Sequence, residues 1–219
     1  MVFDKDGTLV DFHQTWDRAV ASTLEQFCSS DADRRGLAEA IGFDLDGQRV
    51  LPQSPFVAES AATLNQLIAP FGDPREFEDT VIDAGVVNAV ALDGAREVVA
   101  AFEQMGVPMV VATNDTADSA RRQLSALGMA SSFAGFFGYD SGFGPKPEPG
   151  MVTAAARLLD LPVGEVAMVG DSSTDVYSGN AAGAFTVYLA PDPANADPLL
   201  VEAADLVATT LTDVLTLVG

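Results

Sequence analysis

Four short segments of this 219-residue chain combine carboxylates with hydroxyl groups or lysine in patterns that suit metal and phosphate chemistry. They are VFDKDGT (residues 2–8), VVATND (110–115), GPKPEP (144–149) and VGDSSTD (169–175). Several carboxylates cannot crowd into one pocket without a counter-charge. A divalent cation with oxygen ligands supplies it, and Mg²⁺ suits a site of few carboxylates that also receives a phosphate.

The charge balance of the chain narrows the range of partners. Acidic residues outnumber Lys and Arg by 32 to 11, and the formal net charge is −21. We therefore expect neither a nucleic acid nor an anionic membrane as a partner, because both require clustered positive charge. The only two lysines, Lys5 and Lys146, both lie in the four segments, where an anionic phosphate would need them.

The side chains of the four segments need a scaffold that brings them together. After about residue 94, helical and strand-like patterns alternate, as in a parallel sheet wrapped by helices. We expect helices at 95–106, 115–127, 151–159 and 174–182, and strands at 107–113, 133–137, 165–170 and 184–190. Residues 192–200 are expected to form a surface loop before a last short strand and helix. Because parallel strands end at a common edge, we expect one pocket there to contain Asp4, Asp6, Thr113, Lys146, Asp171 and Asp175.

Residues 12–90 show helical periodicity without a convincing strand, with breaks at 29–33, 42–55 and 71–74. This segment is interpreted as a helical insertion between the first strand and the rest of the sheet. The lead-in to the first segment is only Met1 to Phe3, so that strand is either truncated or preceded by further residues in the natural chain.

In the order and spacing of its four segments, the chain resembles the haloacid dehalogenase-like superfamily, in its phosphoglycolate-phosphatase-like branch. The resemblance covers essentially the whole length. It implies an α/β fold: a Rossmann-like, doubly wound parallel sheet core formed by residues 1–11 and 91–219, with an inserted all-helical cap domain at residues 12–90.

The resemblance also implies roles for the first segment. Asp4 matches the nucleophile that attacks phosphorus and becomes an aspartyl phosphate. Asp6 matches the general acid that protonates the leaving oxygen and the base that then activates water, and its backbone carbonyl would bind the metal. Gly7 allows a tight turn beside the phosphate, and Thr8 helps to fix that turn. Lys5 occupies a variable spacer position and is left as an undecided electrostatic contributor.

The other three segments supply the phosphate-binding and metal-binding groups that the resemblance implies. Thr113 and the backbone N–H of Asn114 match the groups that bind phosphoryl oxygens. Lys146 matches the cation that neutralises nucleophile and phosphate. Asp171 matches a Mg²⁺ ligand, alongside Asp4 and Asp6, and Asp175 matches a further acid that binds the metal or orients its waters.

Some of these residues also have structural interpretations. An aspartate before a glycine is common in turns, and Thr113 could cap the helix that begins near Asp115. The hydroxyl residues that follow Asp171 could likewise act as helix caps; they are Ser172, Ser173 and Thr174.

The activity implied by the resemblance is a Mg²⁺-dependent phosphomonoesterase that acts on a small phosphorylated metabolite, with phosphoglycolate favoured. A sugar phosphomutase of the same superfamily and a catalytically weak phosphate-binding or metal-binding regulatory module are the alternatives. A dehalogenase is disfavoured because such enzymes lack the acid/base residue that Asp6 matches. A phosphonate hydrolase is disfavoured because residues 12–90 contain no lysine for an imine. The sequence does not indicate an oligomeric state.

A second pentapeptide, FDLDG at residues 43–47, nearly repeats FDKDG at 3–7. It lacks the following threonine and comes after a helical pattern, so Asp44 to Gly47 is interpreted as a turn. Arg49 is a candidate for binding a second anionic group of the substrate, and Ser54 is a further candidate contact. His13 could line the entrance of the site, although a structural role is favoured.

No apolar run approaches the roughly 20 residues that cross a bilayer, and the N-terminus shows no targeting pattern, so we expect a soluble cytoplasmic protein. Cys28, the single cysteine, cannot form an internal disulfide and is expected to be a packed side chain, as is Trp16.

Overall fold

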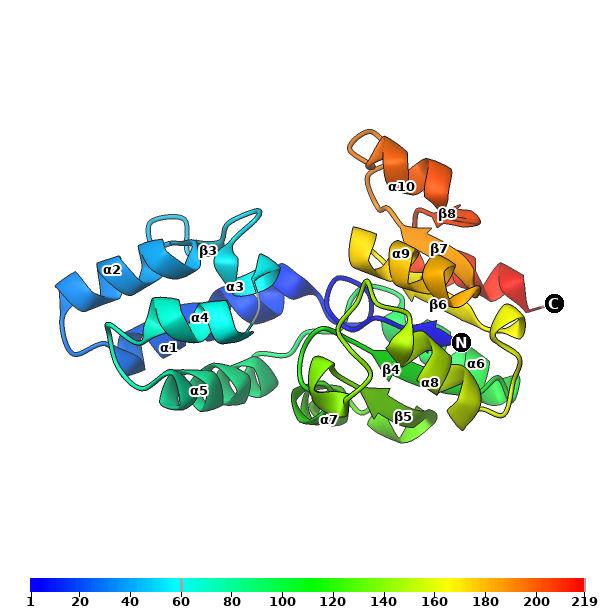
Figure 1. Cartoon of the computed structure of the whole chain (residues 1–219), viewed down its shortest axis with the longest axis horizontal. Coiled ribbons are helices and arrows are strands. Elements are labelled where there is room, and N and C mark those ends of the chain that lie inside the picture. Colours follow the sequence, from blue (N-terminus) through cyan, green and yellow to red (C-terminus); the bar gives the residue numbers. More distant parts are fainter. Residues whose placement is uncertain (60, 219) are drawn as a thin grey trace. The chain divides into compact units, whose positions relative to one another are not determined.

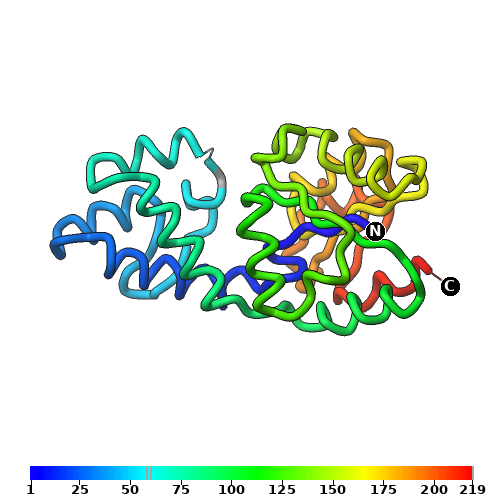
Figure 2. The backbone as a smooth tube through the Cα atoms, turned by 90° about the horizontal axis from the view of Figure 1, so that it is seen from below, coloured from blue at the N-terminus to red at the C-terminus, as the bar shows by residue number. Residues whose placement is uncertain are grey.

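Two units make up the chain in the computed structural model, which describes residues 1–59 and 61–218. Unit 1 consists of Met1–Asp11 with Ala91–Gly219, and unit 2 consists of Phe12–Val90. The two connections leave unit 1 side by side, as the tube in Figure 2 shows, because Val10 and Ala91 form an antiparallel bridge. The N–H of Leu92 also donates to the carbonyl of Leu9 at 3.0 Å.

A six-stranded sheet forms the centre of unit 1, in the order β5-β4-β1-β6-β7-β8 (Figure 1). Every neighbouring pair is parallel. The strands are β1 Val2–Phe3, β4 Met109–Ala112, β5 Phe133–Phe137, β6 Ala167–Gly170, β7 Phe185–Leu189 and β8 Leu206–Ala208. The predicted doubly wound parallel sheet is thus confirmed, and each predicted strand after residue 94 is present with its ends shifted by at most two residues.

Helices cover both faces of this sheet. They are α6 Ala95–Gln104, α7 Ala117–Ala126, α8 Gly150–Leu158, α9 Ser173–Ala182 and α10 Pro198–Ala203, with a 3₁₀ segment at Leu211–Leu217 and short 3₁₀ turns at Ala130–Ser132, Tyr139–Ser141 and Val163–Glu165. Val2 packs in a buried cluster with Met151 of α8, whereas the ring of Phe3 lies 6.1 Å from that of Phe102 in α6. Successive strand residues face opposite sides, so α8 and α6 cover opposite faces.

The first strand has only two residues, yet it lies at the middle of the sheet. Val2 is in register with Val110 of β4 on one side and with Met168 of β6 on the other. The ladder continues past the strand, because the N–H of Asp4 donates to the carbonyl of Val169 at 2.9 Å. The chain adds β4 and β5 on one side of β1 and β6 to β8 on the other, and sites in such sheets form where the strand order reverses.

The segment after β7 differs from the prediction. Residues 192–200 were expected to be loop, but α10 begins at Pro198 and precedes β8. Its start follows a local signal: Asp197 accepts a hydrogen bond from the N–H of Leu199 at 2.9 Å, and a proline stands at the first helical position. The last element, Leu211–Leu217, is a 3₁₀ helix.

Unit 2 is mostly helical and has its own core. A π-helical turn at His13–Asp17 leads into α1 Arg18–Phe27, and the other helices are α2 Asp31–Ile41, α3 Pro55–Ala58, α4 Ala61–Ile68 and α5 Pro74–Val87. Trp16 is buried in this core and Cys28 packs partly against it, which confirms both packing predictions. Burial is also the main cause that raises the pKa of the Cys28 thiol.

The expectation that residues 12–90 are all-helical is wrong. β2 Phe43–Asp44 and β3 Arg49–Val50 pair as an antiparallel ribbon, with Asp44 opposite Arg49. Two-residue strands are too short to produce a sequence period, so the pattern could not reveal them. Residues 45–48 form the turn between the strands, and Asp44 accepts a hydrogen bond from the N–H of Asp46 at 3.0 Å. The second pentapeptide is therefore a strand end and a turn.

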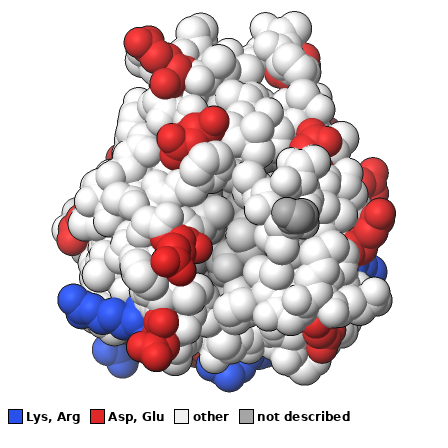
Figure 3. Space-filling view, turned by 90° about the vertical axis from the view of Figure 1, so that its right-hand side faces the viewer, with Lys and Arg blue, Asp and Glu red and all other residues white. Residues whose placement is uncertain are grey.

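Acidic side chains lie in separate places on the face of the molecule that Figure 3 shows, and the few Lys and Arg side chains lie toward its lower edge. This agrees with the acidic composition of the chain. Within residues 1–59 and 61–218, no helix is both long and apolar enough to cross a membrane.

Candidate active site

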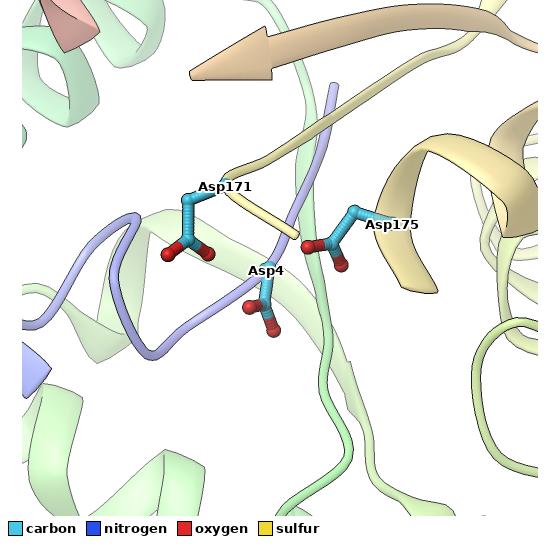
Figure 4. Close-up of side chains that lie close together, drawn as sticks. All are labelled: Asp4, Asp171 and Asp175. Carbon is cyan, nitrogen blue, oxygen red and sulfur yellow. The ribbon is translucent and has the colours of Figure 1, made fainter. Parts of the chain in front are cut away.

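Three carboxylates from different elements gather at the carboxyl edge of the sheet. Asp4 follows β1, Asp171 follows β6, and Asp175 lies in the first turn of α9 (Figure 4). One oxygen of each can be chosen so that all three lie within 4.8 Å of one another. The sequence placed these three residues at one edge, and the structure brings them together.

The backbone around Gly7 allows Asp171 to come this close. Gly7 has φ +77°, and a Cβ at this position would lie 2.0 Å from Oδ2 of Asp171. The turn itself is held by backbone bonds, since the carbonyl of Lys5 accepts from the N–H groups of residues 8, 9 and 10. Thr8 was expected to help fix the turn, but its hydroxyl is buried and has no hydrogen-bond partner among the described residues.

Asp175 is fixed by the way in which α9 begins. Ser172 is the N-cap, and Oδ2 of Asp175 accepts from the Ser172 backbone N–H at 3.1 Å and from its hydroxyl at 2.5 Å. This is a capping box, so one expected structural role of the residues after Asp171 is confirmed for Ser172. The arrangement leaves the other oxygen, Oδ1, directed at Lys146.

Lys146 joins two members of the carboxylate group. Its Nζ donates to Oδ1 of Asp4 and to Oδ1 of Asp175, both at 2.6 Å, and all three side chains are buried. Burial alone would lower the pKa of the lysine, but the two carboxylates raise it well above its usual value. Lys146 is therefore a permanent cation inside the acidic group.

The positive charge of one lysine does not neutralise three carboxylates. The pKa values of two of these carboxylates are raised. Burial, opposed mainly by Lys146, raises the pKa of Asp4 to about 7. Burial and the nearby Asp4 and Asp175 charges raise the pKa of Asp171 well above its usual range. Burial and mutual repulsion thus disfavour the ionised forms of Asp4 and Asp171, and the three hard oxygen donors of the group fit a divalent ion such as Mg²⁺.

The loop that carries Lys146 is clamped to the end of β4. The side chain of Asn114 donates to the Lys146 carbonyl at 2.9 Å and accepts from the Lys146 N–H at 2.8 Å. Thr113 is buried, and its hydroxyl accepts from the N–H of Asp115 at 3.1 Å. The helix cap of α7 is Thr116, which accepts from the N–H of Ser119, so Thr113 is not the cap.

Asp6 lies in a different cluster from Asp4. Its carboxylate pairs with Nζ of Lys5 at 2.7 Å, and the same Nζ lies 3.0 Å from Asp115 and 2.7 Å from Oε1 of Gln123. Sequence reasoning left Lys5 undecided and did not identify Asp115 or Gln123. The rarity of lysine did single out Lys5 in the sequence, but as a partner for phosphate, whereas in the structure its ammonium group pairs with Asp6 and Asp115.

The candidates outside unit 1 fall in several places of unit 2. Arg49 is exposed in β3, where it stands opposite Asp44 in the ribbon. Ser54 is buried and caps α3: its hydroxyl donates to the carbonyl of Ile41 and accepts from the N–H of Phe56. The proposed substrate contact through Ser54 is therefore replaced by a structural role. His13 is half exposed and lies 3.2 Å from Asp17.

Known proteins resemble this chain in sequence and in fold. A phosphoglycolate phosphatase from Neisseria meningitidis is 36% identical over 202 residues, which cover 85% of this chain and 78% of that protein. A HAD family hydrolase from Deinococcus radiodurans, solved with bound phosphate and sodium, superposes with a TM-score of 0.64 at 25% identity and covers 97% of this chain and 91% of its own. A putative beta-phosphoglucomutase from Thermotoga maritima has a TM-score of 0.71 at 18% identity, with 100% and 98% covered, and shares the fold.

The family is shown by a match that includes all four sequence segments singled out at the start. The matching family model is that of the haloacid dehalogenase-like hydrolases, and it covers residues 1–183. These residues contain β1, the loop that carries Lys146, and the carboxylates that follow β1 and β6. This chain belongs to the haloacid dehalogenase-like hydrolases.

Proposed function

We propose that the chain is a Mg²⁺-dependent phosphomonoesterase that acts on a small phosphorylated metabolite. The observation that carries the proposal is the group of Asp4, Asp171 and Asp175 around Lys146 at the carboxyl edge of the sheet. A buried cation and a set of hard oxygen ligands are what a phosphoryl group with its metal requires. The phosphatase relatives support the same assignment.

Asp4 is the proposed nucleophile. Its carboxylate oxygen forms a bond to phosphorus while the ester P–O bond breaks, and the leaving oxygen takes a proton from the Asp6 carboxyl group. Water then attacks the phosphorus of the aspartyl phosphate, Asp6 takes a proton from that water, and the Asp4 carboxylate is released with inorganic phosphate. Lys146, held 2.6 Å from Asp4, reduces the repulsion between the nucleophile and the anionic substrate.

Asp4, Asp171 and the backbone carbonyl of Asp6 would hold the Mg²⁺ ion, with Asp175 as a ligand or as a partner of its waters. A bound Mg²⁺ ion neutralises charge on the phosphoryl oxygens. Thr113 and the N–H of Asn114 would bind phosphoryl oxygens at the end of β4, and Gly7 and Thr8, in the turn after β1, would complete the phosphate site.

Phosphoglycolate is the favoured substrate because several relatives carry that name. Other relatives are named pyrophosphatase, so the choice within small phosphorylated compounds stays a proposal. The assignment of residues 12–90 as a cap and of Arg49 as a substrate contact are likewise predictions.

The test is phosphate release from a panel of phosphorylated metabolites that includes 2-phosphoglycolate, with and without Mg²⁺. The Asp4→Asn variant should lose turnover. The matched control is Asp44→Asn, which makes the same change in the second pentapeptide, and it should retain turnover. Movement of phosphate from the 1-position to the 6-position of a sugar, without release, would instead favour a phosphomutase. Loss of turnover in Asp44→Asn but not in Asp4→Asn would overturn the site.

A further inference from the structure

Lys5 is a buried cation that the proposed chemistry does not use. Its side chain is fully buried, with 0% exposed. Its ammonium group lies 2.7 Å from Asp6, 3.0 Å from Asp115 and 2.7 Å from the Gln123 side-chain oxygen. An ammonium group has three donors, and these three acceptors match them in number.

This cluster extends into α7. Oδ2 of Asp115 accepts from the hydroxyl of Ser119 at 2.6 Å, and Oδ1 accepts from the N–H of Thr116 at 2.7 Å. Ser119 and Gln123 are both buried. Asp115 therefore gives Lys5 a fixed anchor at the start of α7, and the lysine connects that anchor to the loop after β1.

A buried ammonium group is costly unless carboxylates pair with it. Two carboxylates meet this need for Lys5, because Asp6 lies 2.7 Å and Asp115 lies 3.0 Å from its Nζ. Asp6 is 22% exposed, compared with 16% for Asp115, so it is the carboxylate of the pair that reaches closer to solvent.

Asp4 and Asp6 are only two residues apart, yet each carboxylate pairs with a different lysine. Lys146 pairs with Asp4, and Lys5 pairs with Asp6. Each of the two carboxylates is thus held by a cation anchored elsewhere in unit 1: Lys146 also pairs with Asp175, and Lys5 with Asp115.

We propose that Lys5 is the positioning residue for Asp6, holding its carboxyl group at a fixed place through the anchor at Asp115. The inference rests on the proposed function, because it takes Asp6 as the group that gives a proton to the leaving oxygen. A displacement of about 1 Å can cost a reaction about 100-fold, so loss of the lysine should impair proton transfer more than binding.

The alternative is that Lys5 only balances the buried charge of Asp115. The two roles differ in their dependence on the leaving group. An alkoxide leaving group needs a proton from Asp6, whereas p-nitrophenolate leaves readily without one. The value of kcat/KM reports the steps up to departure of the leaving group. A loss of kcat/KM for the alkyl ester alone therefore indicates a misplaced acid, whereas an equal loss for both substrates indicates general damage to the site.

The experiment compares Lys5→Met with wild type on 2-phosphoglycolate and on p-nitrophenyl phosphate, with Mg²⁺ present. We expect kcat/KM to fall by about 10-fold to 100-fold for the alkyl ester, with KM little changed, and by less than about 3-fold for p-nitrophenyl phosphate. Gln123→Met is the matched control, because it places methionine in the same buried cluster and leaves the pair between Lys5 and Asp6. It should change both substrates in parallel.

A second variant guards against loss of the fold. Lys5→Met with Asp115→Asn removes one positive and one negative charge together, so charge balance in the cluster is kept. If Lys5 positions Asp6, the double variant regains thermal stability but keeps the selective loss on the alkyl ester. Recovery of activity on that ester, or an equal loss on both substrates, would overturn the proposal.

The outcomes separate this inference from the proposed function. If wild type turns over both substrates, Asp4→Asn turns over neither and Lys5→Met matches wild type on both, only the role of Lys5 is wrong. If wild type releases no phosphate from either substrate or from the rest of the panel, both proposals are wrong.

Discussion

Replacing Lys146 by methionine removes the cation that pairs with Asp4 and Asp175 while keeping most of the volume of the side chain. Both ionic hydrogen bonds, each 2.6 Å long, would be lost, and two buried carboxylates would remain without their partner. Removal of one partner from a buried pair costs about 3–5 kcal/mol. For a chain of this size that corresponds to a fall of roughly 6–20 °C in the melting temperature of unit 1.

The loss of stability caused by Lys146→Met should increase with pH. The pKa of Asp4 is about 7 in the folded protein, raised from 3.8, so this group adds stability at low pH that is lost as pH rises through about 7. Lys146 opposes that loss by lowering the pKa of Asp4. In the Lys146→Met variant, the ionised carboxylates of Asp4 and Asp175 would have no lysine to neutralise them at high pH. The destabilisation should therefore be larger at pH 8 than at pH 5.

Thermal and urea denaturation, followed by far-UV circular dichroism at pH 5 and pH 8 without divalent ions, measure this effect. Arg122→Met is the control: Arg122 lies 3.9 Å from Asp118 in an exposed pair, which should be worth less than about 1 kcal/mol. Catalysis by Lys146→Met should also fall by about 100-fold or more. A cost below about 1 kcal/mol at pH 8, or one equal at both pH values, would refute the charge balance described above.

Two further outcomes follow from the carboxylate group. Mg²⁺ at 100 times its Kd at pH 8 should stabilise the protein by about 2.7 kcal/mol. The same Mg²⁺ concentration should raise the melting temperature less at pH 5.5, because the raised pKa values of Asp4 and Asp171 make protons compete with the ion and weaken its binding. Asp171→Asn should reduce that rise, and an undiminished rise would count against the metal site. Gly7→Ala should lower the free energy of unfolding by more than about 1 kcal/mol, because φ is +77° and the new Cβ would meet Asp171; calorimetry that finds a neutral change would contradict this.

Much of the site follows from local patterns in the sequence. Apolar runs that end in Asp4, Thr113 or Asp171 predict parallel strands, and parallel strands place their last residues at one edge. The cap signal around Ser172 and Asp175 is also local, since a serine and an acid three positions later come within hydrogen-bond reach in the first turn of a helix. These features were predictable because each depends on residues close together in the chain.

The partners of the two lysines depend on contacts between distant residues. Lys146 meets Asp4 across 142 positions, and Lys5 meets Gln123 across 118. The ribbon of β2 and β3 was missed because it has too few residues to produce a period, and α10 was missed because its cap signal was taken for a loop.

The sequence by itself determined the sheet, its site-bearing edge and the residues that stand there. Only the tertiary structure decided which cation serves which carboxylate: Asp4 is held by Lys146 and Asp6 by Lys5. The physical reason is that charge pairing acts through space at a few ångströms, whereas sequence patterns report only the spacing of residues along one element.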